Sequence, residues 1–132
     1  MTVSLPYTPF GLAEEAYTPT KAFFKAGRVL AIATDLNPGT AWCENMQFAI
    51  ALACRYMHLT TAQAIASAAI GRADRVGSLQ PGKQADLVLL EAPDYRHLGY
   101  RFGTNLVSRT IKRVRLYIHK KKRRSYGSSG WL

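Results

Sequence analysis

Apolar residues are concentrated in four stretches of the chain. Residues 28–33 (RVLAIA) form a short, nearly continuous apolar run, which predicts a parallel strand buried on both faces. Residues 46–57 (MQFAIALACRYM) are mostly apolar over a length typical of a helix. Residues 85–90 (ADLVLL) follow a turn signal, QPGK, and give the clearest strand prediction. In residues 109–118 (RTIKRVRLYI), charged and apolar side chains roughly alternate, which predicts one further strand.

Start and stop signals predict two more helix boundaries. Pro19 suits the first turn of a helix, with Thr18 as its candidate N-cap and Gly27 as its C-terminal stop. A capping box at Thr60 predicts a helix that runs to about Ala69. The first eleven residues show no clear period and are interpreted as an extended segment or loop. The predicted class is therefore α/β, with a small β element in the second half.

Composition limits the classes of function. At 132 residues and 48% hydrophobic, the chain has material for one modest core. No apolar run reaches membrane-spanning length and no signal peptide is recognisable, so we expect a cytoplasmic protein without a membrane partner. Cys43 and Cys54 are too few for a disulfide framework or a thiolate zinc site. Both are interpreted as reduced core residues within an apolar helical pattern.

The formal net charge of +10 is concentrated at the C-terminal end. Residues 1–108 carry 9 Lys/Arg and 8 Asp/Glu, whereas residues 109–132 carry 9 Lys/Arg and no acidic residue. Residues 119–132 lack the apolar content needed for a core and are predicted to form a disordered basic tail. A solvated tail is the more common explanation for such a run. The tail could also bind nucleic-acid phosphates non-specifically. Its cationic residues are Lys120, Lys121, Lys122, Arg123 and Arg124.

Asp35 follows the first apolar run after one residue, Thr34, and precedes the turn sequence LNPGT. A carboxylate at the C-terminal end of a parallel barrel strand can bind a cation or accept a proton from a metal-bound water. The turn would bring Asn37, Gly39 and Thr40 to the same mouth of the barrel. The alternative is that Asp35 caps the following helix and that the turn is an ordinary one.

Residues 77–90 (GSLQPGKQADLVLL) resemble the C-terminal signature of the amidohydrolase superfamily, which leads from a metal-dependent barrel into a β-sandwich. Within that superfamily, the closer likeness is to the imidazolonepropionase family. Residues 33–40 (ATDLNPGT) resemble its strand 8, and residues 91–107 resemble its segment between the sandwich strands. The resemblance runs from about Leu5 to Arg113.

The resemblance implies a fold and an activity. Residues 1–75 would be the C-terminal part of a metal-dependent (β/α)8 barrel, and residues 76–118 strands of a small β-sandwich. The implied reaction is hydrolysis of 4-imidazolone-5-propanoate to N-formimino-L-glutamate, a step of histidine degradation, with zinc or iron. The family's site residues carry over to Asp35 as metal ligand and proton acceptor, Asn37 and Gly39 as product contacts, and Thr40 as substrate contact.

The metal ligands depart from the family pattern. A catalytic zinc ordinarily takes three protein ligands. The family uses a His-x-His pair, which this chain lacks, and His58, His97 and His119 match none of its ligand positions. His58 and His97 are interpreted as surface or packing residues.

Three hypotheses about function follow. The chain is the C-terminal portion of an enzyme, or a non-catalytic fragment whose basic tail binds nucleic acid. As a third hypothesis it is an assembly subunit, completing a barrel in a homo-oligomer or with a barrel portion supplied in trans.

Overall fold

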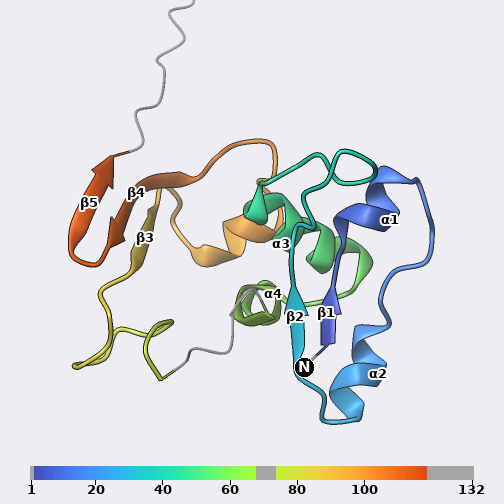
Figure 1. Cartoon of the computed structure of the whole chain (residues 1–132), viewed down its shortest axis with the longest axis horizontal. Coiled ribbons are helices and arrows are strands. Elements are labelled where there is room, and N and C mark those ends of the chain that lie inside the picture. The colour runs from blue at the N-terminus through green and yellow to red at the C-terminus, as the bar shows by residue number, and fades with distance from the viewer. Residues whose placement is uncertain (1, 68–73, 119–132) are drawn as a thin grey trace, which may run out of the picture.

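A computed structural model describes residues 2–67 and 74–118 of the chain. In chain order, the elements are β1 (Thr2–Ser4), α1 (Tyr7–Gly11), α2 (Thr20–Lys25), β2 (Leu30–Ile32), α3 (Met46–Tyr56), α4 (Thr61–Ser67), β3 (Leu87–Leu90), the 3-10 helix η1 (Tyr95–Gly99), β4 (Val107–Lys112) and β5 (Arg115–Ile118). α4 lies between the β1–β2 pair and the β3–β4–β5 sheet, α3 passes behind the β1–β2 pair in this view, and α1 and α2 lie beyond β1 (Figure 1). The predicted mixed α/β class is confirmed, whereas the barrel and the sandwich stay predictions.

β1 and β2 form a parallel pair in which Thr2 lies opposite Leu30 and Ser4 opposite Ile32. All three residues of β2 are buried, as the apolar run predicted. The interpretation of the first eleven residues as an extended segment or loop was incomplete, because this stretch contains both β1 and α1. A three-residue strand has no period of its own, and its partner is supplied by a distant part of the chain.

The predicted boundaries of α2 are partly correct. Gly27 follows the helix with a φ of +64°, the left-handed conformation expected of a C-terminal stop. Thr18 is not the N-cap, because that position is taken by Pro19, which makes no side-chain capping bond. The Thr18 hydroxyl instead bonds the Ser4 hydroxyl at 2.6 Å. A tertiary contact with β1 has replaced a local cap.

α3 and α4 occupy the predicted positions. The Thr60 hydroxyl accepts from the Gln63 N–H at 3.2 Å and the Gln63 side chain accepts from the Thr60 N–H at 2.9 Å, which confirms the capping box. The predicted end of α4 at Ala69 lies outside the described residues. Both cysteines are free and half-buried, and Cys54 lies in α3. Cys43 precedes that helix, so the helical pattern predicted around it was wrong.

None of the helices in the described ranges is long and apolar enough to cross a membrane.

The second half of the described chain forms an antiparallel sheet in the order β3–β4–β5. β3 begins at Leu87, two residues later than predicted. The single strand predicted over residues 109–118 was wrong, because it is a hairpin that turns at Arg113 and Val114. Their φ angles of 47° and 67° suit a two-residue hairpin turn. Neither residue is Gly, Asn or Asp, so the sequence carried no signal for the turn.

The larger apolar cluster joins the two halves of the described chain. It contains Leu30 and Ile32 of β2, residues of α3 and α4, and Leu98 and Leu106 from the second half. A smaller cluster around Leu52 packs Tyr7 and Ala41 against α3. The basic tail predicted over residues 119–132 lies outside the described residues. The predicted division into domains stays a prediction.

Candidate active-site turn after β2

Asp35 follows the C-terminal end of β2 and has a φ of +51°. This left-handed conformation is uncommon for a residue with a side chain, but Asp and Asn tolerate it better than most others. The carboxylate is exposed. Because β1 runs parallel to β2, the segment that leads from β1 into α1 reaches the same edge as Asp35.

Asn37 organises the turn after Asp35. Its Oδ1 accepts from the backbone N–H groups of Gly39 and Thr40, each at 2.9 Å. Its Nδ2 donates to the Asp35 carbonyl oxygen at 2.7 Å. The backbones of Asn37 and Ala41 also bond each other, at 3.2 and 3.3 Å. The side chain of Asn37 therefore fixes the turn from inside, as Asn does in an Asx-turn.

The predicted site residues lie together. The Asn37 Nδ2 is 3.5 Å from Asp35 Oδ2 and 3.2 Å from the Thr40 hydroxyl. Gly39 is in the same turn, and the nearest atom to a Cβ added there would be Asn37 Oδ1 at 3.3 Å. The turn brings these four residues together, whereas their place at the mouth of a barrel and their chemical roles stay predictions.

Two residues of α1 complete the site, and sequence reasoning missed both. The Thr8 hydroxyl donates to Asp35 Oδ2 at 3.5 Å, a long and weak bond. Gly11 packs against the backbone of Thr40. The parallel pairing of β1 and β2 was the signal that could have found them, and a three-residue strand with one apolar side chain gives no sign of that pairing.

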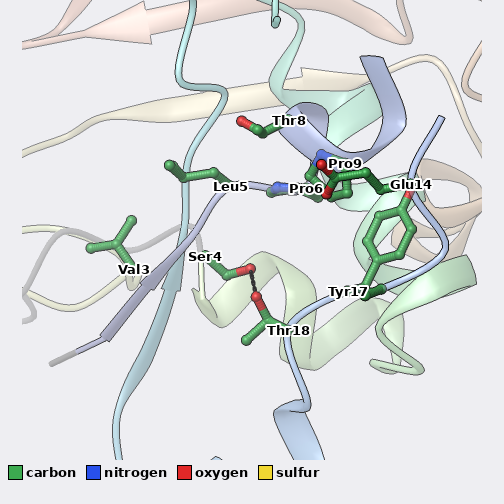
Figure 2. A pocket seen from close by; sticks show the side chains of 10 residues that line it. Val3, Ser4, Leu5, Pro6, Thr8, Pro9, Glu14, Tyr17 and Thr18 are labelled. Atoms are coloured by element: carbon green, nitrogen blue, oxygen red, sulfur yellow. Dashed lines mark hydrogen bonds between the residues drawn. The ribbon is translucent and has the colours of Figure 1, made fainter. Parts of the chain in front are cut away.

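A small pocket lies on the other side of Thr8, between β1, α1 and the loop that leads to α2 (Figure 2). Its volume is about 280 Å³, and Thr8, Glu14 and Tyr17 are among its lining residues. The hydrogen bond between Ser4 and Thr18 joins two of its lining residues (Figure 2). Thr8 thus belongs both to this pocket and to the surroundings of Asp35.

The alternative role of Asp35 as a helix cap is wrong. α3 is capped by Asn45, whose side chain accepts from the N–H groups of Gln47 and Phe48. The Tyr7 hydroxyl donates to the Asn45 carbonyl at 2.7 Å and accepts from the Cys43 thiol at 3.1 Å. Burial, followed by the Cys43 contact, raises the pKa of Tyr7 above its ordinary value. This buried phenol connects α1 to the start of α3.

The two histidines in the described ranges do not gather around Asp35. The described ranges contain no group of three or more His, Cys, Asp or Glu side chains placed to hold a metal ion. His58 is exposed just after α3, and His97 bonds the Tyr100 hydroxyl at 3.0 Å. Both placements agree with the interpretation of these histidines as surface or packing residues. His119 lies outside the described residues.

Comparison with known proteins gives the decisive observation. The chain is 52% identical over 120 residues to an imidazolonepropionase of Herpetosiphon aurantiacus, matching 86% of this chain and 28% of that protein. This chain is similar to a portion of imidazolonepropionase. An imidazolonepropionase of Porphyromonas gingivalis is 44% identical over 114 residues, covering 82% of this chain and 27% of the relative. An imidazolonepropionase of Parabacteroides distasonis is 42% identical over 120 residues, covering 86% of this chain and 29% of the relative.

The resemblance to imidazolonepropionase predicted from the sequence is confirmed by these similarities. The chain spans less than a third of the length of these relatives, consistent with a C-terminal portion. No family model matches the chain.

Proposed function

We propose that this chain is the C-terminal portion of a cytoplasmic imidazolonepropionase, which hydrolyses 4-imidazolone-5-propanoate to N-formimino-L-glutamate. The observation that carries the proposal is the 52% identity to the Herpetosiphon aurantiacus protein. The position of Asp35 agrees with it, since barrel enzymes hold their reactive side chains after the C-terminal ends of parallel strands.

The proposed chemical role of Asp35 is that of a metal ligand and a proton acceptor. Its carboxylate is exposed, and its two donors among the described residues, the Thr8 hydroxyl and Asn37 Nδ2, are each 3.5 Å from Oδ2, so these weak bonds leave its oxygens available to a cation or a proton. Asn37, Gly39 and Thr40 are the proposed substrate and product contacts. Because the Gly39 N–H already bonds Asn37 Oδ1, a ligand would use the carbonyl of Gly39 or open that bond.

The residues described do not make a metal site by themselves. A catalytic zinc ordinarily uses three protein ligands, and one carboxylate with neutral hydroxyl and amide neighbours does not provide them. We therefore propose that zinc or iron is held jointly, with Asp35 as one ligand. The other ligands would come from a barrel portion supplied in trans or from another copy of this chain in a homo-oligomer.

The proposal is tested by reconstitution. The part of the Herpetosiphon aurantiacus protein that this chain does not match is co-expressed with this chain, and ring opening and bound zinc or iron are measured on the purified complex. Asp35→Asn is the diagnostic variant, because Asn keeps the size of the side chain and tolerates a positive φ. Glu15→Gln, which neutralises an exposed carboxylate in the segment between α1 and α2, is the matched control.

We expect activity and bound metal in the complex and with Glu15→Gln, and loss of both with Asp35→Asn. A stable complex in which Asp35→Asn retains full activity and metal would contradict the role of Asp35. A stable complex without ring opening would favour the alternative, a non-catalytic fragment.

A further inference from the structure

The β4–β5 hairpin is the most basic part of the described chain. Within only seven residues it carries four exposed cationic side chains, those of Arg109, Lys112, Arg113 and Arg115. The preceding 108 residues carry nearly balanced charge, with 9 Lys/Arg against 8 Asp/Glu. Within the described residues, the excess positive charge is therefore localised on one supersecondary element, at the end of the molecule away from α1 and α2 (Figure 1).

One of the four cations is neutralised and three are not. Lys112 Nζ bonds Asp86 Oδ2 at 2.5 Å. Asp86 also accepts from the backbone N–H of Arg113 at 3.0 Å, which fixes the carboxylate beside the turn. In the described parts of the chain, the guanidinium groups of Arg109, Arg113 and Arg115 have no hydrogen-bond or ion-pair partner.

The register of the hairpin distributes these cations over both faces. Thr110 lies opposite Tyr117 and Lys112 opposite Arg115, so these residues share one face of the sheet. Arg109 lies on the other face, together with the Ile111–Leu116 pair. Arg113 is in the turn itself. Positive charge thus surrounds the hairpin instead of lining one side of it.

We propose that the β4–β5 hairpin binds single-stranded nucleic acid. A flexible polyanion can follow cations around both faces and the turn, whereas a flat anionic membrane would contact one face at a time. Each arginine offers a planar set of donors that matches phosphate oxygens. Tyr117, which is 52% exposed and shares a face with Arg115, provides a ring on which a base can stack. The proposal is independent of the imidazolonepropionase assignment.

The basic run at Lys120–Arg124 follows β5 in the sequence and would add to the same binding, so the experiment has to separate the two. Binding of a labelled oligothymidylate of about 16 nucleotides is measured with the full chain by fluorescence anisotropy. The salt concentration is varied from about 50 to about 200 mM. Each hairpin variant is measured in two backgrounds. One is the native sequence, and the other has all five residues of Lys120–Arg124 changed to Gln.

The diagnostic variant changes Arg109, Arg113 and Arg115 together to Gln. Each phosphate contact contributes about 0.7 to the slope of log K against log salt for a single strand. We therefore expect the triple variant to reduce the slope by about 2 in both backgrounds. Arg113→Asn, whose new residue suits the positive φ of the turn, should reduce it by about 0.7 and keeps the hairpin intact.

The matched control changes Lys21, Lys25 and Arg28 to Gln, which removes the same charge from exposed positions in and after α2. It should leave the slope nearly unchanged if the hairpin is the site. Equal slopes for the hairpin and control variants would overturn the proposal. So would a chain that binds phosphatidylserine vesicles but not the oligonucleotide, since a membrane would then be the partner.

Discussion

Gly11 lies so close to the carbonyl group of Thr40 that a Cβ on Gly11 would overlap it. The end of α1 is thereby packed directly against the turn that follows Asp35. We predict that Gly11→Ala forces the two backbones apart and lowers the free energy of unfolding by about 1–3 kcal/mol. Urea denaturation of the purified chain measures the change.

Gly103→Ala is the control for this substitution, because a Cβ at Gly103 meets no atom within 4 Å and its φ is not in the left-handed region. Equal stability of the two alanine variants would show that α1 and the turn are not in contact.

The amide of Asn37 holds the turn through two N–H groups, those of Gly39 and Thr40. Replacing Asn37 with Ala removes the acceptor and should speed hydrogen exchange at both amides, each hydrogen bond contributing about 1 kcal/mol. Asn37→Asp keeps an acceptor oxygen at the same position and should preserve most of the protection. Exchange followed by NMR distinguishes them, and unchanged protection in Asn37→Ala would refute the Asx-turn.

The N-terminus of α3 depends on the Asn45 side chain, which accepts from Gln47 N at 3.0 Å and from Phe48 N at 3.3 Å. Asn45→Ala leaves these donors without their cap and should cost about 1 kcal/mol in the free energy of unfolding. Asn45→Asp should retain the cap. Thermal denaturation, monitored by circular dichroism, compares the native chain with Asn45→Ala and Asn45→Asp. An Asn45→Ala variant as stable as the native chain would contradict the role of the cap.

The contact between Asp86 and Lys112 should make the β3–β4–β5 sheet sensitive to acid. The Lys112 ammonium, followed by the Arg113 N–H, lowers the pKa of Asp86 from 3.8 to about 2. Because the folded pKa lies below the unfolded one, the stabilisation is present above pH 3.8 and is lost as the pH falls through about 2. In Asp86→Asn this part of the pH dependence should be absent.

Unfolding temperatures of the native chain and Asp86→Asn, measured from neutral pH down to about pH 2, test this prediction, with Glu15→Gln as the control. The native chain and the control should converge on Asp86→Asn at low pH. A constant difference between the native chain and Asp86→Asn across the range would contradict it.

Local patterns were sufficient to predict the elements whose signals lie within themselves. The apolar run of β2, the helix over α3 and the capping box at Thr60 each depend on neighbouring residues, and each is present. Elements that depend on distant partners were missed. β1 is stabilised by pairing with β2, and the turn at Arg113 adopts a conformation for which its residue type gives no signal.

The same distinction applies to the candidate site. Asp35, Asn37, Gly39 and Thr40 are close in sequence, so their grouping could be predicted from one turn. Thr8 reaches Asp35 because two parallel strands end at the same edge. A long-range contact of this kind becomes visible only when the pairing of the strands is known.

The larger apolar cluster has a consequence for how the chain responds to being cut or unfolded. Leu98 and Leu106 are buried against side chains of β2, α3 and α4. Separating the chain near residue 75 would expose both leucines together with the helical surface that covers them. The parts of the described chain before and after residue 75 are therefore expected to unfold in a single transition. Neither part is suited to expression as an independent module.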